Sequence, residues 1–193
     1  MRHVTPSWFM ELFDRTLRPL LCNAQSLVAP HVRPGDRVAD LGCGAGYFSV
    51  ALSRLVGATG EVVLVDVQPA MLERAQVRCA RDRRASARLT PVLADGASFT
   101  PAGHLDFALL SWMLHEVENV AGLWHGLAAA LAPGGRALVL EPRWHVSREQ
   151  FEAELAPAVA LGLERTDLPP ACFSRVALLQ APEAYVAAGN PSS

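Results

Sequence analysis

The chain has 193 residues, of which 51% are apolar and 19% are charged, and its formal net charge is −2. This length suits one domain with a substantial core, and the composition argues against a largely disordered chain. The small negative charge differs from the strongly basic character of nucleic-acid-binding domains, so no nucleic-acid partner is expected.

The cysteines and the N-terminal residues bear on the cellular location. Cys22, Cys43, Cys79 and Cys172 lie far apart, and none belongs to a Cys-x-x-Cys pair. This spacing predicts neither a disulfide framework nor a zinc site, so Cys22 and Cys172 are interpreted as small buried apolar residues. Residues 1–6 do not resemble a signal peptide, and no apolar run approaches the roughly 18 residues that span a bilayer. We expect a cytoplasmic protein without membrane contact.

Strand and helix patterns alternate along the chain, which is typical of a parallel sheet covered by helices on both faces. Residues 7–29 have apolar side chains near helical spacing, which predicts one or two helices in an N-terminal cap over residues 1–30. Strands are then predicted at residues 37–41, 61–66, 89–94, 105–110 and 136–140. Helices are predicted at residues 47–56, 69–80 and 117–131, the last stopped by a turn at 132–135.

The C-terminal part predicts one more helix and a hairpin. Residues 147–150 have the pattern of a capping box that begins a helix extending to about residue 161. Two last strands, 163–167 and 175–180, are expected on either side of a turn at Pro169-Pro170. No internal repeat or long linker divides the chain, so a single α/β domain is predicted over residues 1–180, with a flexible tail at 181–193.

Residues 40–46, Asp-Leu-Gly-Cys-Gly-Ala-Gly, lie between a predicted strand and a predicted helix. Glycines at this position let the backbone approach a ligand closely, at a helix N-terminus and at the carboxyl end of the sheet. The dinucleotide fingerprint would require a third glycine at position 47, which is Tyr47. The acid before the loop favours a ligand with a positive group, so an NAD-dependent oxidoreductase is a less favoured alternative.

Residues 38–46 resemble motif I of class I S-adenosylmethionine (SAM)-dependent methyltransferases. Three further landmarks of that family follow in order, which are Asp66, Asp95-Gly96 and the Ala-Pro-Gly-Gly segment at 132–135. The resemblance covers about residues 35–141 and implies SAM as the cofactor, whose methionine amino group would suit Asp40. It also implies a Rossmann-like, doubly wound sheet of seven strands in the order 3-2-1-4-5-7-6, with strand seven antiparallel.

The resemblance assigns roles to the residues that follow the first strands. Asp66 would bind the ribose hydroxyls, Val67 or Gln68 would flank the adenine, and Asp95 would reach the adenine amino group. The full set of expected cofactor contacts is Asp40, Gly42, Gly44, Gly46, Asp66, Val67, Gln68, Asp95, Gly96 and Ser111.

Three shorter segments, at residues 6–9, 113–117 and 141–147, resemble a small bacterial and archaeal, type 11-like branch of these methyltransferases. That resemblance implies no particular acceptor. The N-terminal aromatic residues Trp8, Phe9 and Phe13 either pack in the core or cover the SAM and acceptor pocket, and the pattern does not decide between the two.

Candidate catalytic residues follow the fourth and fifth strands, which the expected sheet makes neighbours. His115 follows strand four, Glu141 ends strand five, and His145 comes four residues later. Methyl transfer needs alignment of the acceptor, and a hydroxyl acceptor also needs a base. We predict His145 as that base, with His115 as a second candidate or a residue that only lines the site. Glu141 either serves the substrate, caps Ser147 or pairs with Arg143. No metal is expected, because the spacing matches no metal motif.

The sequence thus predicts a SAM-dependent methyltransferase that acts on a small-molecule acceptor. A SAM-binding regulator or pseudoenzyme without turnover is the main alternative, because an intact glycine loop predicts binding but not catalysis. The acceptor and the oligomeric state are left open.

Overall fold

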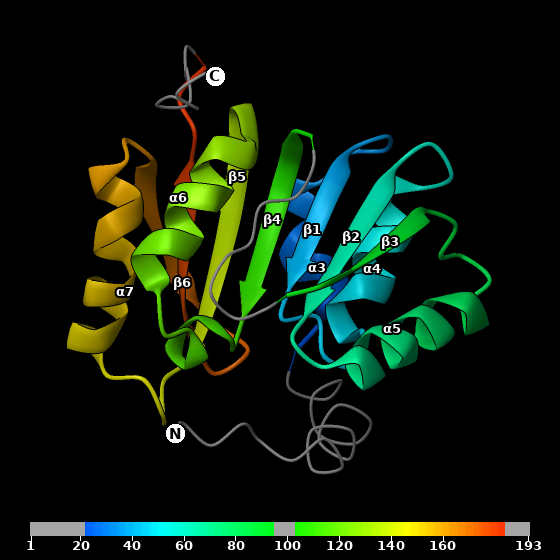
Figure 1. The fold of residues 1–193 in the computed structure, drawn as a ribbon, viewed down its shortest axis with the longest axis horizontal. Helices are drawn as coiled ribbons and strands as arrows, with labels where there is room; N and C mark the ends of the chain where they lie inside the picture. The colour runs from blue at the N-terminus through cyan, green and yellow to red at the C-terminus, as the bar shows by residue number, and fades with distance from the viewer. Residues whose placement is uncertain (1–21, 95–102, 184–193) are drawn as a thin grey trace.

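The computed structural model describes residues 22–94 and 103–183 and contains a seven-stranded sheet with helices on both faces (Figure 1). The strand order is β3-β2-β1-β4-β5-β7-β6. Strand β7 runs antiparallel to both β5 and β6, whereas the other pairs are parallel. The predicted fold class, strand order and antiparallel seventh strand are confirmed.

The elements have the following bounds. The strands are β1 (Arg37–Leu41), β2 (Glu61–Asp66), β3 (Arg88–Leu93), β4 (Leu105–Ser111), β5 (Leu131–Pro142), β6 (Glu164–Ala171) and β7 (Ser174–Gln180). The helices are α3 (Ala24–Val28), α4 (Tyr47–Val56), α5 (Pro69–Arg81), α6 (Val120–Ala130) and α7 (Arg148–Ala160), with 3-10 turns η1 (Ala29–His31) and η2 (Leu114–Glu116).

The core has two layers, one on each side of the sheet. Helices α6 and α7 cover one face, where Trp124 and Phe151 are buried, and α3, α4 and α5 cover the other (Figure 1). Neighbouring strand residues point to opposite layers, as Val38 and Ala39 do in β1. All residues of β2 are buried, which explains its continuous apolar run, since a central parallel strand is covered on both faces.

Two predicted boundaries near the fourth and fifth strands are shifted. Helix α6 begins at Val120, three residues later than predicted, because the side chain of Asn119 accepts a hydrogen bond from the Gly122 N–H and caps the helix there. Strand β5 begins directly after α6, so residues 132–135 lie in the strand and not in a separate turn. Helix α7 begins as predicted, with the Ser147 hydroxyl accepting from the Gln150 N–H.

The predicted turn at Pro169-Pro170 is wrong. Both prolines lie within β6, and the turn of the hairpin is formed by Cys172 and Phe173, at φ angles of 52° and 57°. Strand β6 is at the edge of the sheet, where a residue without an N–H can be tolerated, and the pairing with β7 is irregular between Leu168 and Ala171.

The ends of the chain lie mostly outside the described residues. Of the predicted N-terminal helices, the structure describes only α3 and η1, and the aromatic residues Trp8, Phe9 and Phe13 lie outside it. Ala181, expected as the first residue of a flexible tail, is fully buried and donates its N–H to the Gly135 carbonyl. Residues 184–193 lie outside the described part.

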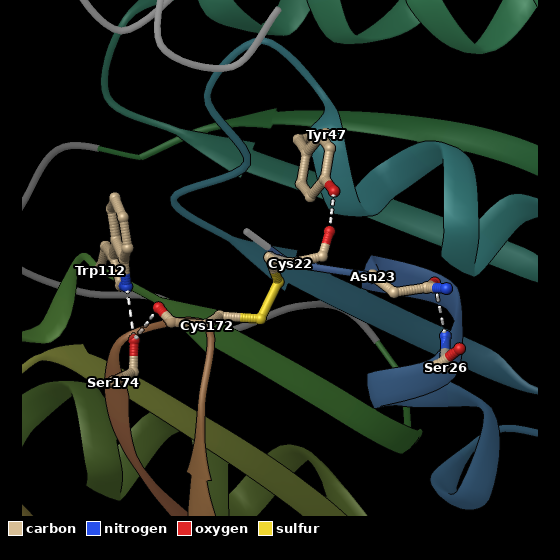
Figure 2. The surroundings of a disulfide bond; sticks show 7 residues. All are labelled: Cys22, Asn23, Ser26, Tyr47, Trp112, Cys172 and Ser174. Carbon is tan, nitrogen blue, oxygen red and sulfur yellow. Dashed lines mark hydrogen bonds between the residues drawn. A yellow bond between two sulfur atoms is a disulfide. The ribbon is translucent and has the colours of Figure 1, made fainter. Parts of the chain in front are cut away.

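The structure contains a disulfide bond between Cys22 and Cys172, so the prediction that the cysteines are unpaired is wrong for these two (Figure 2). The two residues are 150 positions apart in the sequence, but their Cα atoms are 4.7 Å apart. Spacing along the chain carries no information about such a pair, because the fold alone brings the β6–β7 turn to the segment before α3. Cys43 and Cys79 are free and buried, and burial raises the pKa of Cys79 to about 12.

The disulfide lies within a small network of hydrogen bonds (Figure 2). The Tyr47 hydroxyl donates to the Cys22 carbonyl at the start of α4. On the other side, Trp112 Nε1 donates to Ser174 Oγ over 2.7 Å, and Ser174 Oγ donates to the Cys172 carbonyl over 3.1 Å. The disulfide therefore connects the helix that follows the glycine loop to the hairpin and to the residue that follows β4.

We expect Cys172→Ser to lower the free energy of unfolding by about 2–5 kcal/mol, because the unfolded chain loses a constraint on a long loop. The measurement is urea unfolding with and without dithiothreitol. Wild-type protein should lose stability in the reductant, whereas the variant should be equally stable in both conditions. Equal stability of the wild type in both conditions, with four reactive thiols in the unfolded protein, would show that the disulfide does not form.

Candidate functional site

The glycine loop after β1 has three glycines with positive φ, and two of them are needed for packing. A Cβ at Gly46 would lie 2.7 Å from the Cα of Ala75 in α5, and a Cβ at Gly42 would lie 2.7 Å from the Cβ of Met113. Gly44 differs, because a Cβ there meets no atom within 4 Å. Gly42 and Gly46 thus let the loop pack against its neighbours, and Gly44 faces open space that a ligand can enter.

Asp66, at the end of β2, holds this loop in place. Its Oδ2 accepts from the Gly44 N–H and its Oδ1 accepts from the Gln68 N–H, each over 2.9 Å. Burial raises the pKa of Asp66, although these backbone hydrogen bonds lower it in part. Each carboxylate oxygen has a second lone pair, so the same side chain has acceptor capacity left for hydroxyl groups such as those of a ribose.

Of the other predicted cofactor residues, Asp40, Val67 and Ser111 lie within the described part of the chain. Asp40 is buried beneath the loop, and its Oδ2 accepts from the Ser49 hydroxyl of α4 over 2.5 Å, a partner that the sequence did not indicate. Val67 is 51% exposed, so its surface is accessible to a flat ring, whereas Ser111 is buried at the end of β4. Asp95 and Gly96 lie outside the described residues.

The predicted catalytic residues come together at the ends of β4 and β5. Glu141 is fully buried in β5, and its Oε1 accepts from the Leu114 N–H over 2.8 Å. Its Oε2 is hydrogen-bonded to Nδ1 of His115, which lies in η2 directly after β4. The ring of His145 packs edge-on against that of His115, with centroids 4.9 Å apart.

The partner of Glu141 differs from the two structural partners that the sequence suggested. Glu141 is paired with His115, and among the described residues no hydrogen bond or ion pair joins it to Arg143 or Ser147. Sequence reasoning missed the contribution of the Leu114 backbone, since an N–H group has no signature in a residue pattern.

Glu141 is hydrogen-bonded to His115, and among the described residues it has no hydrogen bond to His145. Burial lowers the pKa of His115, but the hydrogen bond and charge of Glu141, together with the charges of Glu116 and Glu154, raise it more, so the pKa lies above its ordinary value. When neutral, an imidazole that donates from Nδ1 to a carboxylate has its lone pair on Nε2, where it can accept a proton. His145 is exposed, and its ring contacts the His115 ring.

A family model described as a methyltransferase domain matches residues 38–135, which is half of the chain. The chain belongs to this methyltransferase family. Among curated proteins, the ubiquinone/menaquinone biosynthesis C-methyltransferases UbiE of Pseudomonas putida strain F1 and Pseudomonas aeruginosa strain LESB58 are 36% and 37% identical over 111 residues. The matched segment covers 57% of this chain but only 43% of each relative.

Solved structures show the same fold at low sequence identity. A SAM-dependent methyltransferase from Aquifex aeolicus superposes with a TM-score of 0.77 at 16% identity, covering 92% of this chain and 98% of that one. Fibrillarin from Aeropyrum pernix, solved with natively bound SAM, gives a TM-score of 0.62 at 21% identity, covering 82% and 76% of the two chains. The predicted membership of the class I SAM-dependent methyltransferases, with SAM as the family's cofactor, is confirmed.

Two further observations concern the described residues only. They contain no helix that is both long and apolar enough to cross a membrane. They also contain no group of three or more His, Cys, Asp or Glu side chains arranged to hold a metal ion. A disulfide is more typical of oxidising compartments than of the cytoplasm, so the cytoplasmic location stays a prediction.

Gly44→Ala should weaken SAM binding at least about tenfold, which corresponds to about 1.4 kcal/mol, because the new methyl group would enter the space open to the ligand. Gly57→Ala is a matched control. Gly57 also has a positive φ, and a Cβ added there would meet no atom within 4 Å, but it lies at the far end of α4. Titration calorimetry with SAM should therefore separate the two variants, and equal affinities would contradict the placement of the cofactor on this loop.

Proposed function

We propose that this protein transfers a methyl group from SAM to a small-molecule acceptor, and that His115, held by Glu141, takes the proton that the acceptor loses. The observation that carries this proposal is the position of the His115–Glu141 pair. It lies at the ends of β4 and β5, and β4 is the direct neighbour of β1, which leads into the glycine loop. The arrowheads of β1 and β4 point to the same edge of the sheet (Figure 1).

The residues of the loop fit the cofactor. Asp66 would accept from the ribose hydroxyls, Val67 would pack against the adenine, and the backbone around Gly44 would hold the methionine part. Asp40 would stabilise the loop through Ser49 and would attract the positive amino group through its charge. When bound there, SAM supplies a methyl carbon that its sulfonium has already activated.

The protein's own contribution is then to orient the acceptor and to remove a proton. Nε2 of His115 would take the proton that the acceptor loses, so that the acceptor atom could receive the methyl group that bound SAM would supply, with S-adenosylhomocysteine as the second product. The imidazolium that forms is stabilised by Glu141, whose buried charge is itself held by the Leu114 N–H. General-base catalysis of this kind contributes typically about 10²–10⁴-fold.

The extent of the match with the relatives limits the acceptor class. Because the matched segment covers less than half of the UbiE proteins, we infer only a small-molecule acceptor and not their particular one. We also propose that residues 1–180 form a single domain and that no nucleic acid is a substrate. A SAM-binding protein without turnover is the competing function, and it would use the same loop.

His115→Ala should lower turnover by about 10²–10⁴-fold and leave SAM affinity unchanged, because it removes the base but not the glycine loop. His145→Ala should lower turnover less than tenfold. Turnover is measured as S-adenosylhomocysteine formed with a panel of small phenols, alcohols and thiols, and SAM affinity is measured by calorimetry.

Glu141→Gln adds a pH profile to this comparison. Since Glu141 raises the pKa of His115, the variant should reach its full activity at a lower pH than the wild type. Loss of turnover in His145→Ala with little change in His115→Ala would reverse the assignment of the base. SAM binding without any S-adenosylhomocysteine formation in the wild type would favour the protein without turnover.

A further inference from the structure

The two loops that carry His115 and His145 also carry one tryptophan each. Trp112 comes three residues before His115, and Trp144 comes directly before His145. The two indole rings are perpendicular, with centroids 4.9 Å apart, and the two imidazole rings are in contact at the same centroid distance. The same pair of loops thus forms a tryptophan pair beside the histidine pair.

A third ring extends this surface. Phe173, in the turn between β6 and β7, lies with its centroid 6.5 Å from that of Trp144. The Phe173 carbonyl accepts from the Arg143 N–H over 3.0 Å, which fixes the turn against the loop after β5. Trp144 is 63% exposed and Phe173 is 55% exposed. We call Trp112, Trp144 and Phe173 the aromatic cluster.

Hydrogen bonds to the β6–β7 hairpin hold one member of the aromatic cluster, Trp112, in place. Trp112 Nε1 donates to the fully buried Ser174 hydroxyl, which donates to the Cys172 carbonyl next to the disulfide (Figure 2). Trp112, Cys172 and Phe173 all have positive φ angles, between 52° and 59°, which residues other than glycine rarely adopt. Such strain persists only where the surrounding structure imposes it, so the backbone that carries Trp112 and Phe173 is held in place before any ligand binds. Trp144 contacts the rings of both residues.

We propose that the aromatic cluster binds the methyl acceptor, and that the acceptor is a planar aromatic molecule with an ionisable hydroxyl group, a phenol in the broad sense. This inference rests on the proposed function and names its substrate class. Rings that meet at steep angles offer both a face and an edge, and aromatic ligands gain from such contacts beyond the area that they bury. An aliphatic ligand gains only the buried area.

The neighbouring histidine supports the hydroxyl part of the proposal. A phenolic hydroxyl ionises near pH 10, as that of tyrosine does, which is within reach of an imidazole base, whereas an aliphatic alcohol is far less acidic. A phenol lying on the rings of Trp144 and Phe173 would have its hydroxyl near the loop segments that carry His115 and His145, since Trp144 and His145 are adjacent in the chain. Recognition of the ring and removal of the proton are thus assigned to the same two loops.

The test uses 2-naphthol and its saturated analogue decahydro-2-naphthol, which share a two-ring carbon skeleton and one hydroxyl. Binding is measured by calorimetry with and without S-adenosylhomocysteine. Wild-type protein should bind 2-naphthol at least about tenfold more tightly than the saturated analogue. Trp144→Leu should remove this preference while leaving the affinity for S-adenosylhomocysteine unchanged, and Trp144→Phe should restore most of it.

Val77→Ala is the matched control, because Val77 is a 48%-exposed apolar residue on α5, away from the aromatic cluster. It should bind both probes as the wild type does. Equal affinity of the wild type for the two probes, or an unchanged preference in Trp144→Leu, would overturn the proposal. It would also be overturned if the wild type were a dimer and Trp144→Leu a monomer with the same 2-naphthol affinity, since the rings would then contact a second copy.

Different results would refute the proposed methyl transfer and the proposed class of acceptor. A wild type that does not bind S-adenosylhomocysteine and forms none from SAM would refute the proposed function. The preference for 2-naphthol is read without S-adenosylhomocysteine as well, so the recognition of the ring is decided independently of that result.

Discussion

The buried carboxylate of Glu141 is the constraint on which the segment after β4, with its proposed base, depends. Its side chain has no exposed surface, and inside a protein an unpaired charge costs several kcal/mol. The Leu114 N–H and His115 Nδ1 satisfy its two oxygens, so the turn after β4 must lie against the end of β5. The positions of the imidazole and of the tryptophan that precedes it on the same loop follow from this one pairing.

A second carboxylate, at the end of another strand, holds the glycine loop in place. Asp66 ends β2 and holds the loop after β1 through the Gly44 N–H, and Glu141, the next-to-last residue of β5, holds the loop after β4. The glycine loop thus lies at the ends of β1 and β2, and the His115–Glu141 pair, the proposed base and its partner, lies at the ends of β4 and β5. The Cys22–Cys172 disulfide, through Tyr47 and Ser174, connects these two sides.

The strands, the helices and the glycine loop could be predicted because they depend on local patterns, namely alternating elements and glycines at fixed spacing. The strand order followed from the family resemblance that these patterns carry. The meeting of His115, Glu141 and His145 also followed from the sheet order. Which imidazole contacts Glu141 could not be predicted, since it depends on side-chain direction within η2. The Cys22–Cys172 pair and the turn at Cys172 were missed because they arise from contacts between distant segments, and the two prolines of β6 gave a misleading turn signal.

The central claim is that Glu141 holds His115 as a base, and NMR titration of the His115 ring tests it most directly. We expect its pKa to lie above 6.5 with the neutral ring protonated at Nδ1, and to fall in Glu141→Gln, where burial is opposed only by the charges of Glu116 and Glu154. The stability that the pair contributes should be present in full below about pH 6.5 and be lost as the pH rises through the raised pKa. A His115 pKa at or below 6.5 that does not change in Glu141→Gln would contradict the account.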